Sequence, residues 1–221
     1  MTDVRLDVWQ VRPRDIVRAA AAGRRTVARL RRADAVTFAK LLGTAGPAFT
    51  PWDATPTRWA LLACSTADPT DAVARWWDEH AVERARLALR PLWSRGTWDG
   101  IAPFDINNGN LWDGPVLALT RSTLRVGQLT AFYRAVRPIA HEIRRARGCR
   151  VAFGIGEAPL LRQGTVSIWE SPADVTAFAH GAAAHADAVR RTPTQRWYAE
   201  ELFARFAIVD ASGSIGGVAV A

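Results

Sequence analysis

The sequence predicts an α+β protein made of two ferredoxin-like βαββαβ repeats in one chain, with antiparallel sheets covered by helices. Strand-like and helix-like segments follow one another in the same order in each half. The segments DPTDAV (68–73) and SPADVT (171–176) lie at matching points, 103 residues apart. Each carries a proline near a helix start, where its missing N–H costs least. We expect the two sheets to face one another in a barrel-like core.

The first half begins with an alternating strand over residues 4–11 and a helix over 13–32. Two strand-like runs follow, 35–43 and 57–65, joined by a loop rich in glycine, proline and threonine. Helical spacing then extends over 73–89. The segment 94–113 is rich in turn residues and serves as a connection, so the predicted N-terminal unit is 1–113.

The predicted C-terminal unit, 114–221, repeats the plan. It has a strand at 115–122, a helix at 126–146 that contains Pro138, and strands at 149–157 and 165–171. Ser171-Pro172 begins another helix, which Thr192-Pro193 interrupts. Helical spacing resumes over 197–206, and 207–212 is the last predicted strand.

Composition excludes several functional classes. The net charge is +8, but the basic residues are scattered along the chain with acidic residues among them, so no nucleic-acid partner is expected. The arginine-rich segment 24–32 is interpreted as a solvated helix face, with a binding surface as the alternative. Cys64 and Cys149 have no C-x-x-C pattern, which indicates buried thiols in a reducing compartment. Without a signal peptide or an apolar run of about 18 residues, we expect a cytoplasmic protein; peripheral membrane contact stays open.

The segment FAHGAAAHADAVRR (178–191) places two histidines among alanines and glycines. On a helix, His180 and His185 are rotated about 140° apart, so they cannot bind one metal together. His185 belongs to the stripe that should face the sheet, and His180 faces solvent. The members of that stripe are Val175, Phe178, Ala182, His185 and Val189.

His185 therefore stands apart from the other histidines. His141 is predicted at the surface, and His80 in the core or as a helix-end partner. The small neighbours of His185, which include Gly181 and Ala182, would let a flat group approach, as suits a planar macrocycle with one axial ligand. A satisfied core histidine is the alternative. No H-E-x-x-H, G-x-S-x-G or P-loop occurs, and the G-x-G of 153–159 lacks the third glycine of a dinucleotide site.

Five segments, in order along the chain, carry a resemblance to a known family: FAKLLGT with FTP, SRGTWDGIAPF, GPVLALTR, GIGEAPLLRQGTVSIW and EELFARFAIVDASGSIGG. Together they resemble the spheroidene monooxygenase family of bacterial carotenoid biosynthesis. The resemblance implies a fold like that of haem-containing dimeric α/β-barrel enzymes. It also implies a haem b protein that oxidises an apolar substrate with dioxygen and an electron donor such as ferredoxin. The family's histidine after the SIW strand falls on His185, which would be the iron ligand.

The resemblance also implies roles for other side chains. The distal wall would come from the C-terminal sheet, with Phe153, Ile155, Glu157 and Trp169 as its candidates. Residues in family-like motifs would serve catalysis or hold the cofactor. A structural role is the alternative for these motif residues, such as pairing of Arg205 with Glu201 at i,i+4. The implied catalytic residues are Glu157, Gln163 and Arg95, and the implied cofactor contacts are Phe178, Ala182, Phe153, Ile155, Trp169 and Arg205.

Three classes of function stay open at this point. The first is the haem-dependent monooxygenase, acting on a carotenoid or a smaller apolar substrate. The second is a haem-dependent dehydratase or another enzyme of nitrogen chemistry, resembling aldoxime dehydratases. The third is a barrel without cofactor, either an oxygenase or a ligand-binding protein. Homodimerisation is also left open.

Overall fold

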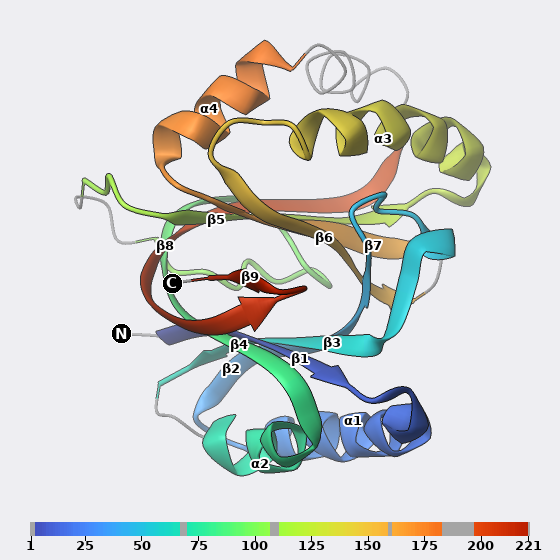
Figure 1. Ribbon diagram of the computed structural model, residues 1–221, viewed down its shortest axis with the longest axis vertical. Helices are drawn as coiled ribbons and strands as arrows, with labels where there is room; N and C mark the ends of the chain where they lie inside the picture. The colour runs from blue at the N-terminus through green and yellow to red at the C-terminus, as the bar shows by residue number, and fades with distance from the viewer. Residues whose placement is uncertain (1–2, 67–69, 107–110, 159–160, 183–196, 221) are drawn as a thin grey trace.

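The computed structural model describes residues 3–66, 70–106, 111–158, 161–182 and 197–220 (Figure 1). Two βαββαβ units follow one another, as the sequence predicts. The first unit consists of β1 (Asp3–Val11), α1 (Ile16–Leu30), β2 (Val36–Ala45), β3 (Ala54–Ser65), α2 (Thr70–His80) and β4 (Ala81–Gly96). The second consists of β5 (Val116–Leu124), α3 (Leu129–Ile143), β6 (Cys149–Ala158), β7 (Arg162–Trp169), α4 (Pro172–Gly181) and β8 (Tyr198–Ile215). A short strand, β9 (Val218–Ala219), follows β8.

The strands form one closed antiparallel barrel. Their order is β4-β1-β3-β2-β6-β7-β5-β8, and β8 pairs again with β4. The two units thus meet at two seams, β2 with β6 and β4 with β8. Helices α1 and α2 cover one side of the barrel, and α3 and α4 cover the opposite side (Figure 1). The predicted fold class is confirmed.

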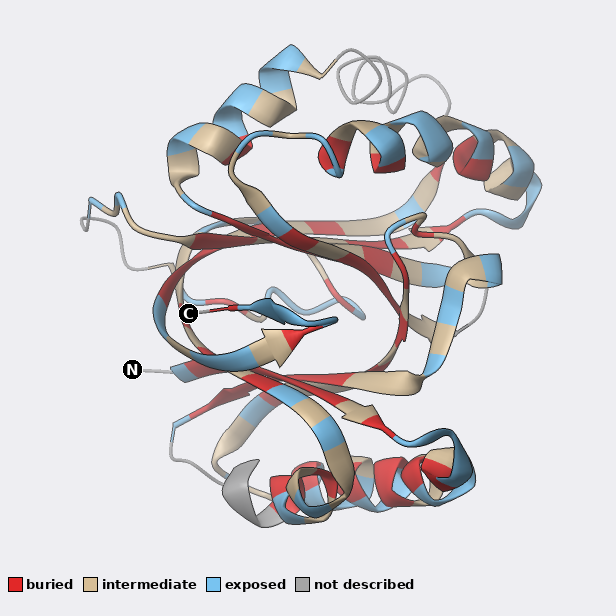
Figure 2. Cartoon of the chain, in the orientation of Figure 1, coloured by how far each residue is buried: buried red, intermediate tan, exposed pale blue. Residues whose placement is uncertain are grey.

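Side chains fill the interior of the barrel. Alternate residues of each strand point inward, and Figure 2 shows buried residues along the strands. Trp98 and Phe104 of the connecting segment enter this core, as do Ile215 and Val220 near the C-terminus. Phe104 packs edge-on against Phe206 of β8, with ring centroids 4.8 Å apart. Trp98 and Phe104 therefore have structural roles in the barrel core.

One predicted helix is too long, and another is wrong. The helix expected over 73–89 ends at His80, and β4 begins at the next residue. The helix expected over 197–206 lies instead within the 18-residue strand β8. Both segments are rich in alanine, glutamate and arginine, which favour helices locally. Pairing of β4 with β8 outweighs this preference because it buries the alternate apolar residues Ala85, Leu87 and Leu89 of β4 and Leu202, Ala204 and Phe206 of β8.

Helix α4 is shorter than predicted. Its N-cap is Ser171, whose hydroxyl accepts a hydrogen bond from the Asp174 amide at 3.2 Å. The helix ends at Gly181, and Ala182 has an extended conformation with φ −76° and ψ 112°. The prediction that His185 lies on the same helix stripe as Phe178 assumed one continuous helix. It does not hold beyond Gly181, where α4 ends. His185 itself and Val189 lie outside the described residues.

Candidate cofactor site

The layer between helices and sheet holds a cluster of tryptophans in the N-terminal unit. Trp9 of β1 stacks on Trp77 of α2 with centroids 5.3 Å apart, and Trp59 of β3 lies 5.7 Å from the same ring. The indole N–H of Trp77 donates to the Thr26 hydroxyl at 3.0 Å. Trp76 packs against this cluster as well. These rings occupy much of the space between α1, α2 and their sheet, and a groove remains beside α1, lined by Gly23, Val27, Leu41 and Trp59 among others.

The corresponding sheet face of the C-terminal unit carries small side chains. In one row across three strands, Ala118 of β5 pairs with Ser167 of β7, which pairs with Ala152 of β6. In the next row, Thr120 pairs with Thr165, which pairs with Gly154. This small-residue floor, as we call it, consists of Ala118, Thr120, Ala152, Gly154, Thr165 and Ser167. Both alanines and both threonines are only half-buried, so the floor is not fully covered.

Aromatic and apolar side chains stand at the end of the floor nearest α4. Phe178 of α4 lies against Trp169 of β7, with ring centroids 5.3 Å apart and planes tilted by 41°. The Trp169 indole N–H donates to the Ser167 hydroxyl at 2.8 Å, which fixes the ring beside the floor. Ala140 and Ile143 of α3 belong to the same apolar cluster. The floor thus has walls from α3, α4 and β7.

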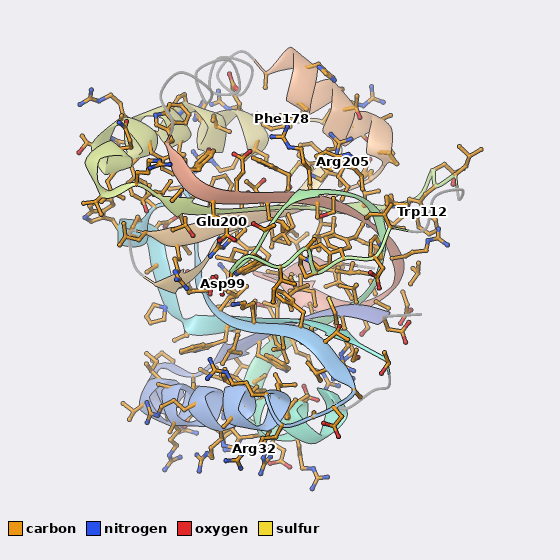
Figure 3. The ribbon with its side chains drawn as sticks, turned by 180° about the vertical axis from the view of Figure 1, so that it is seen from behind. Arg32, Asp99, Trp112, Phe178, Glu200 and Arg205 are labelled. Carbon is orange, nitrogen blue, oxygen red and sulfur yellow. The ribbon has the colours of Figure 1, made fainter. Side chains whose placement is uncertain are left out.

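Arg205 of β8 is on the same face, in register with Ala118. Figure 3 shows Arg205 and Phe178 on one side of the sheet, beside α4. The Arg205 guanidinium donates to the Thr176 hydroxyl at 3.3 Å. Burial lowers the pKa of Arg205 from its usual value, but arginine is in effect always protonated in proteins. The predicted i,i+4 pair with Glu201 is wrong, because both residues are in a strand and Glu201 instead accepts from Arg95.

The predicted distal wall does not form a single surface. Phe153 and Ile155 of β6 belong to the core inside the barrel, whereas Trp169 is on the outer face beneath the helices. Alternate residues of a strand point to opposite faces, so Glu157 shares the inward direction of Phe153. Grouping these three residues with Trp169 was therefore wrong. Gln163 is six residues before Trp169 on β7, so its side chain points to the same outer face of the sheet.

Arg95 lies two strands from the floor, in the row of Thr120: it pairs with Phe203 of β8, which pairs with Thr120 of β5. Its side chain, on β4, is 67% exposed, and its guanidinium is 3.0 Å from a carboxylate oxygen of Glu201. It also lies over the ring of Phe203, 5.7 Å from the centroid. These contacts describe a surface ion pair stacked on an aromatic ring.

Glu157 belongs to a charge cluster at one end of the barrel, which sequence reasoning missed. Its carboxylate accepts from the Trp98 indole at 2.5 Å, Lys40 at 3.3 Å and Arg121 at 3.4 Å. Arg121 of β5 is 2% exposed and also donates to Glu200 of β8. Burial alone would raise the pKa of Glu200. Hydrogen bonds from the Gly100 amide, the Thr97 hydroxyl and Arg121 exceed that effect and lower it to about 2. The cluster fastens the segment 97–100 to the barrel, as Figure 3 shows for Asp99 and Glu200.

The other histidines and the cysteines have structural or surface positions. His141 and His180 are exposed, as predicted. His80 ends α2, where its ring stacks on Trp76 at 4.3 Å, as the helix-end alternative expected. Burial raises the pKa of Cys64 to about 12 and that of Cys149 to about 11. Among the described residues, no group of three histidine, cysteine or acidic side chains could hold a metal ion.

Comparison with known proteins identifies relatives of the chain. The chain is 37% identical to spheroidene monooxygenase of Rhodobacter capsulatus over 193 residues, which cover 81% of this chain and 78% of that protein. It is 31% identical to the Cereibacter sphaeroides enzyme of the same name over 191 residues, 81% of this chain and 57% of the relative. No family model matches the sequence.

Solved structures share the fold at low sequence identity. An aldoxime dehydratase superposes with a TM-score of 0.61 at 12% identity, covering 95% of this chain and 81% of that chain. A second structure, of aldoxime dehydratase in complex with butyraldoxime, superposes with a TM-score of 0.57 at 12% identity. The superposition covers 95% of this chain and 79% of that chain. Within the described part of the chain, no helix is long and apolar enough to cross a membrane.

Fold and relatives together define an oxidoreductase, a monooxygenase built on a barrel of two ferredoxin-like units. Within that class, the chain belongs to the spheroidene monooxygenase family.

Proposed function

We propose that the chain is a haem-dependent monooxygenase that binds haem b between the small-residue floor and helices α3 and α4. In this proposal it oxidises an apolar substrate, a carotenoid or a smaller hydrophobic molecule, with dioxygen and electrons from an external donor. The observation that carries the proposal is the contrast between the two units. Tryptophans pack in the helix–sheet layer of the first unit, whereas small residues form the sheet side of the same layer in the second.

The floor fits a planar macrocycle in shape and in charge. Protein interiors are close-packed, so the half-buried alanines and threonines of the floor are compatible with another group beneath the two helices, whereas Phe49 already covers Gly154. Trp169 and Phe178 offer apolar contact at the edge of such a group. The Arg205 guanidinium offers a cation that pairs well with carboxylates, such as the propionates of haem.

His185 is the proposed iron ligand. The Ala182 amide donates to the Phe178 carbonyl at 3.0 Å, so the chain leaves α4 at the turn that carries Phe178. His185 is three residues after Ala182 in the sequence. A neutral imidazole is the usual proximal ligand of haem iron, and its second nitrogen needs an acceptor that fixes the ring.

Bound haem would supply the activation of dioxygen. The reaction inserts one oxygen atom into a C–H bond of the substrate, and the second atom becomes water by taking two electrons and two protons. In this scheme Trp169 and Phe178 exclude water from the layer, and Arg205 orients the macrocycle. Gln163, on the outer face of β7, is the candidate hydrogen-bond donor on the sheet side. Glu157 is engaged inside the barrel and has no part in this scheme.

Two matched histidine substitutions test the proposal. We expect the wild-type protein and His180→Ala to bind one haem per chain, with a Soret band that shifts on reduction and addition of carbon monoxide. His185→Ala should lose haem. Normal haem retention by His185→Ala would contradict the ligand assignment, and a wild-type protein that gains no Soret band with haemin would contradict the cofactor. Turnover by the reduced protein without oxygen would instead favour dehydratase chemistry.

A further inference from the structure

Helix α3 carries a row of exposed arginines on its outer surface. At 100° per residue, Arg134, Arg137 and Arg144 fall within a sector of about 80°, and Arg145 follows at the end of the helix. We call these four residues the α3 arginine crest. All four are exposed, and none forms an ion pair with another described residue. Four exposed guanidinium groups so close together present a cluster of positive charge to solvent, and Glu142 is the acidic residue of the helix.

The inner side of α3 faces the proposed haem layer. Ala140 and Ile143 pack in one cluster with Trp169 and Val175. Arg137 and Arg144 are three and four residues from Ala140, which places them 60° and 40° from it around the helix, so the crest runs along the edge of the buried face, beside the proposed haem layer. An electron donor seated on the crest would thus lie close to the cofactor.

Helix α1 offers a comparison surface. Arg25, Arg29 and Arg32 are also exposed and lie within about 60° of one another on the helix. However, α1 is on the opposite side of the barrel from α3 (Figure 1), and Arg32 lies at that far end in Figure 3. A donor bound there would face the tryptophan-rich layer, with the whole barrel between it and the floor. Position, and not charge alone, distinguishes the two helices.

We propose that the α3 arginine crest is the docking surface for an acidic electron-carrier protein. This inference rests on the proposed function, which needs two electrons from outside the chain for each turnover. A cationic row pairs with an acidic protein surface by charge complementarity, which mainly raises the association rate. Exposed charges can attract a phospholipid surface as well. The electron carrier is favoured because the crest lies beside the layer that must be reduced.

The test compares charge reversal on the two helices. The variants are Arg134→Glu/Arg137→Glu/Arg144→Glu on α3 and Arg25→Glu/Arg29→Glu/Arg32→Glu on α1, and the probe is an acidic [2Fe–2S] ferredoxin. The association constant at low salt should fall at least tenfold in the α3 variant and change less than twofold in the α1 variant. Raising the salt concentration should reduce the difference. Haem reduction by the reduced probe should slow by a similar factor, whereas reduction by dithionite should be unchanged.

The two readouts separate this inference from the proposed function. Binding of the probe is measured with and without haem, so it decides the docking surface even if the protein binds no haem. Equal losses in both triple variants, or no loss in the α3 variant, would overturn the proposal. If the α3 variant lost binding to phosphatidylglycerol vesicles but kept its binding to the probe, the proposal would be overturned as well. If the reversed α3 variant unfolds, the neutral Arg134→Gln/Arg137→Gln/Arg144→Gln variant should show a smaller loss of the same kind.

Discussion

Phe178 of α4 rests against the indole of Trp169 of β7, with ring centroids 5.3 Å apart. It is the aromatic contact between α4 and the sheet it covers, so it sets the height of the helix above the small-residue floor. Replacing Phe178 with alanine should lower the free energy of unfolding by roughly 1–3 kcal/mol and speed the release of haem. Urea denaturation and transfer of haem to apomyoglobin measure the two effects. Phe178→Leu should retain most of the stability and most of the slow haem release. An unchanged haem release rate in Phe178→Ala would show that α4 does not help to hold the cofactor.

The floor should not tolerate a large side chain. In Ala152→Leu, the added atoms would stand in the layer between sheet and helices, so haem stoichiometry should fall well below one per chain. The far-ultraviolet circular dichroism should be unchanged, because the substituted side chain points out of the barrel. Ala88→Leu on β4 is a matched control on a distant half-buried position and should bind haem normally. Full haem binding by Ala152→Leu would place the cofactor elsewhere.

Arg205 should contribute to haem affinity through its charge. Arg205→Ala should weaken haem binding about tenfold, as expected for loss of one charge-assisted hydrogen bond of about 1.4 kcal/mol. Arg205→Lys keeps the cation and should recover part of the affinity. The measurement is a haemin titration followed at the Soret band. Equal affinities for the alanine and lysine variants would show that the charge is not involved.

Glu200 should make stability depend on pH at the acidic end. Its pKa in the folded protein is about 2, below the ordinary 4.5, so the unfolded chain binds the proton more readily. The stabilisation is thus fully present above about pH 4.5 and is lost as the pH falls toward 2. We expect Glu200→Gln to reduce the free energy of unfolding by about 2 kcal/mol at pH 7. The difference from wild type should shrink between pH 4.5 and pH 2; a constant difference would contradict this account.

The two cysteines should be unreactive in the folded protein. Burial raises the pKa of Cys64 to about 12 and that of Cys149 to about 11, so almost no thiolate exists at pH 8. Iodoacetamide at pH 8 should label neither thiol within minutes, and both should react in urea. Mass spectrometry of the intact protein reads the result. Rapid labelling of Cys149 without urea would mean that β6 opens at its first residue.

Much of the fold could be predicted from the sequence because most segments have local signals. Strands β5 and β7 are rich in β-branched and apolar residues, and the prolines near α2 and α4 mark their starts. Strand β4 and the first half of β8 were missed because their composition favours a helix, and they pair with each other across more than 100 residues of sequence, whereas the strand predicted at 207–212 lies within β8. The period of two in Ala85, Leu87 and Leu89 was the available signal.

The candidate site could be predicted only in part. Phe178, Trp169 and Arg205 lie on one face of the sheet, but the small-residue floor was not foreseen. Ala118, Ala152 and Gly154 become neighbours only through the register of three strands. Arg121 was also missed, since nothing in its local sequence shows that a charged residue faces the barrel interior and finds partners there.

Covalent linkage of both βαββαβ units, closed by the β4–β8 seam, lets the two halves of the barrel diverge. An assembly of identical subunits would carry the same mutation in every copy, so each change to a binding surface would be repeated in the supporting scaffold. Here the tryptophan-rich first half can be selected for rigidity, while the second half is selected for the ligand that it binds. An asymmetric pseudo-dimer of this kind should evolve new specificities by substitutions in its second half alone.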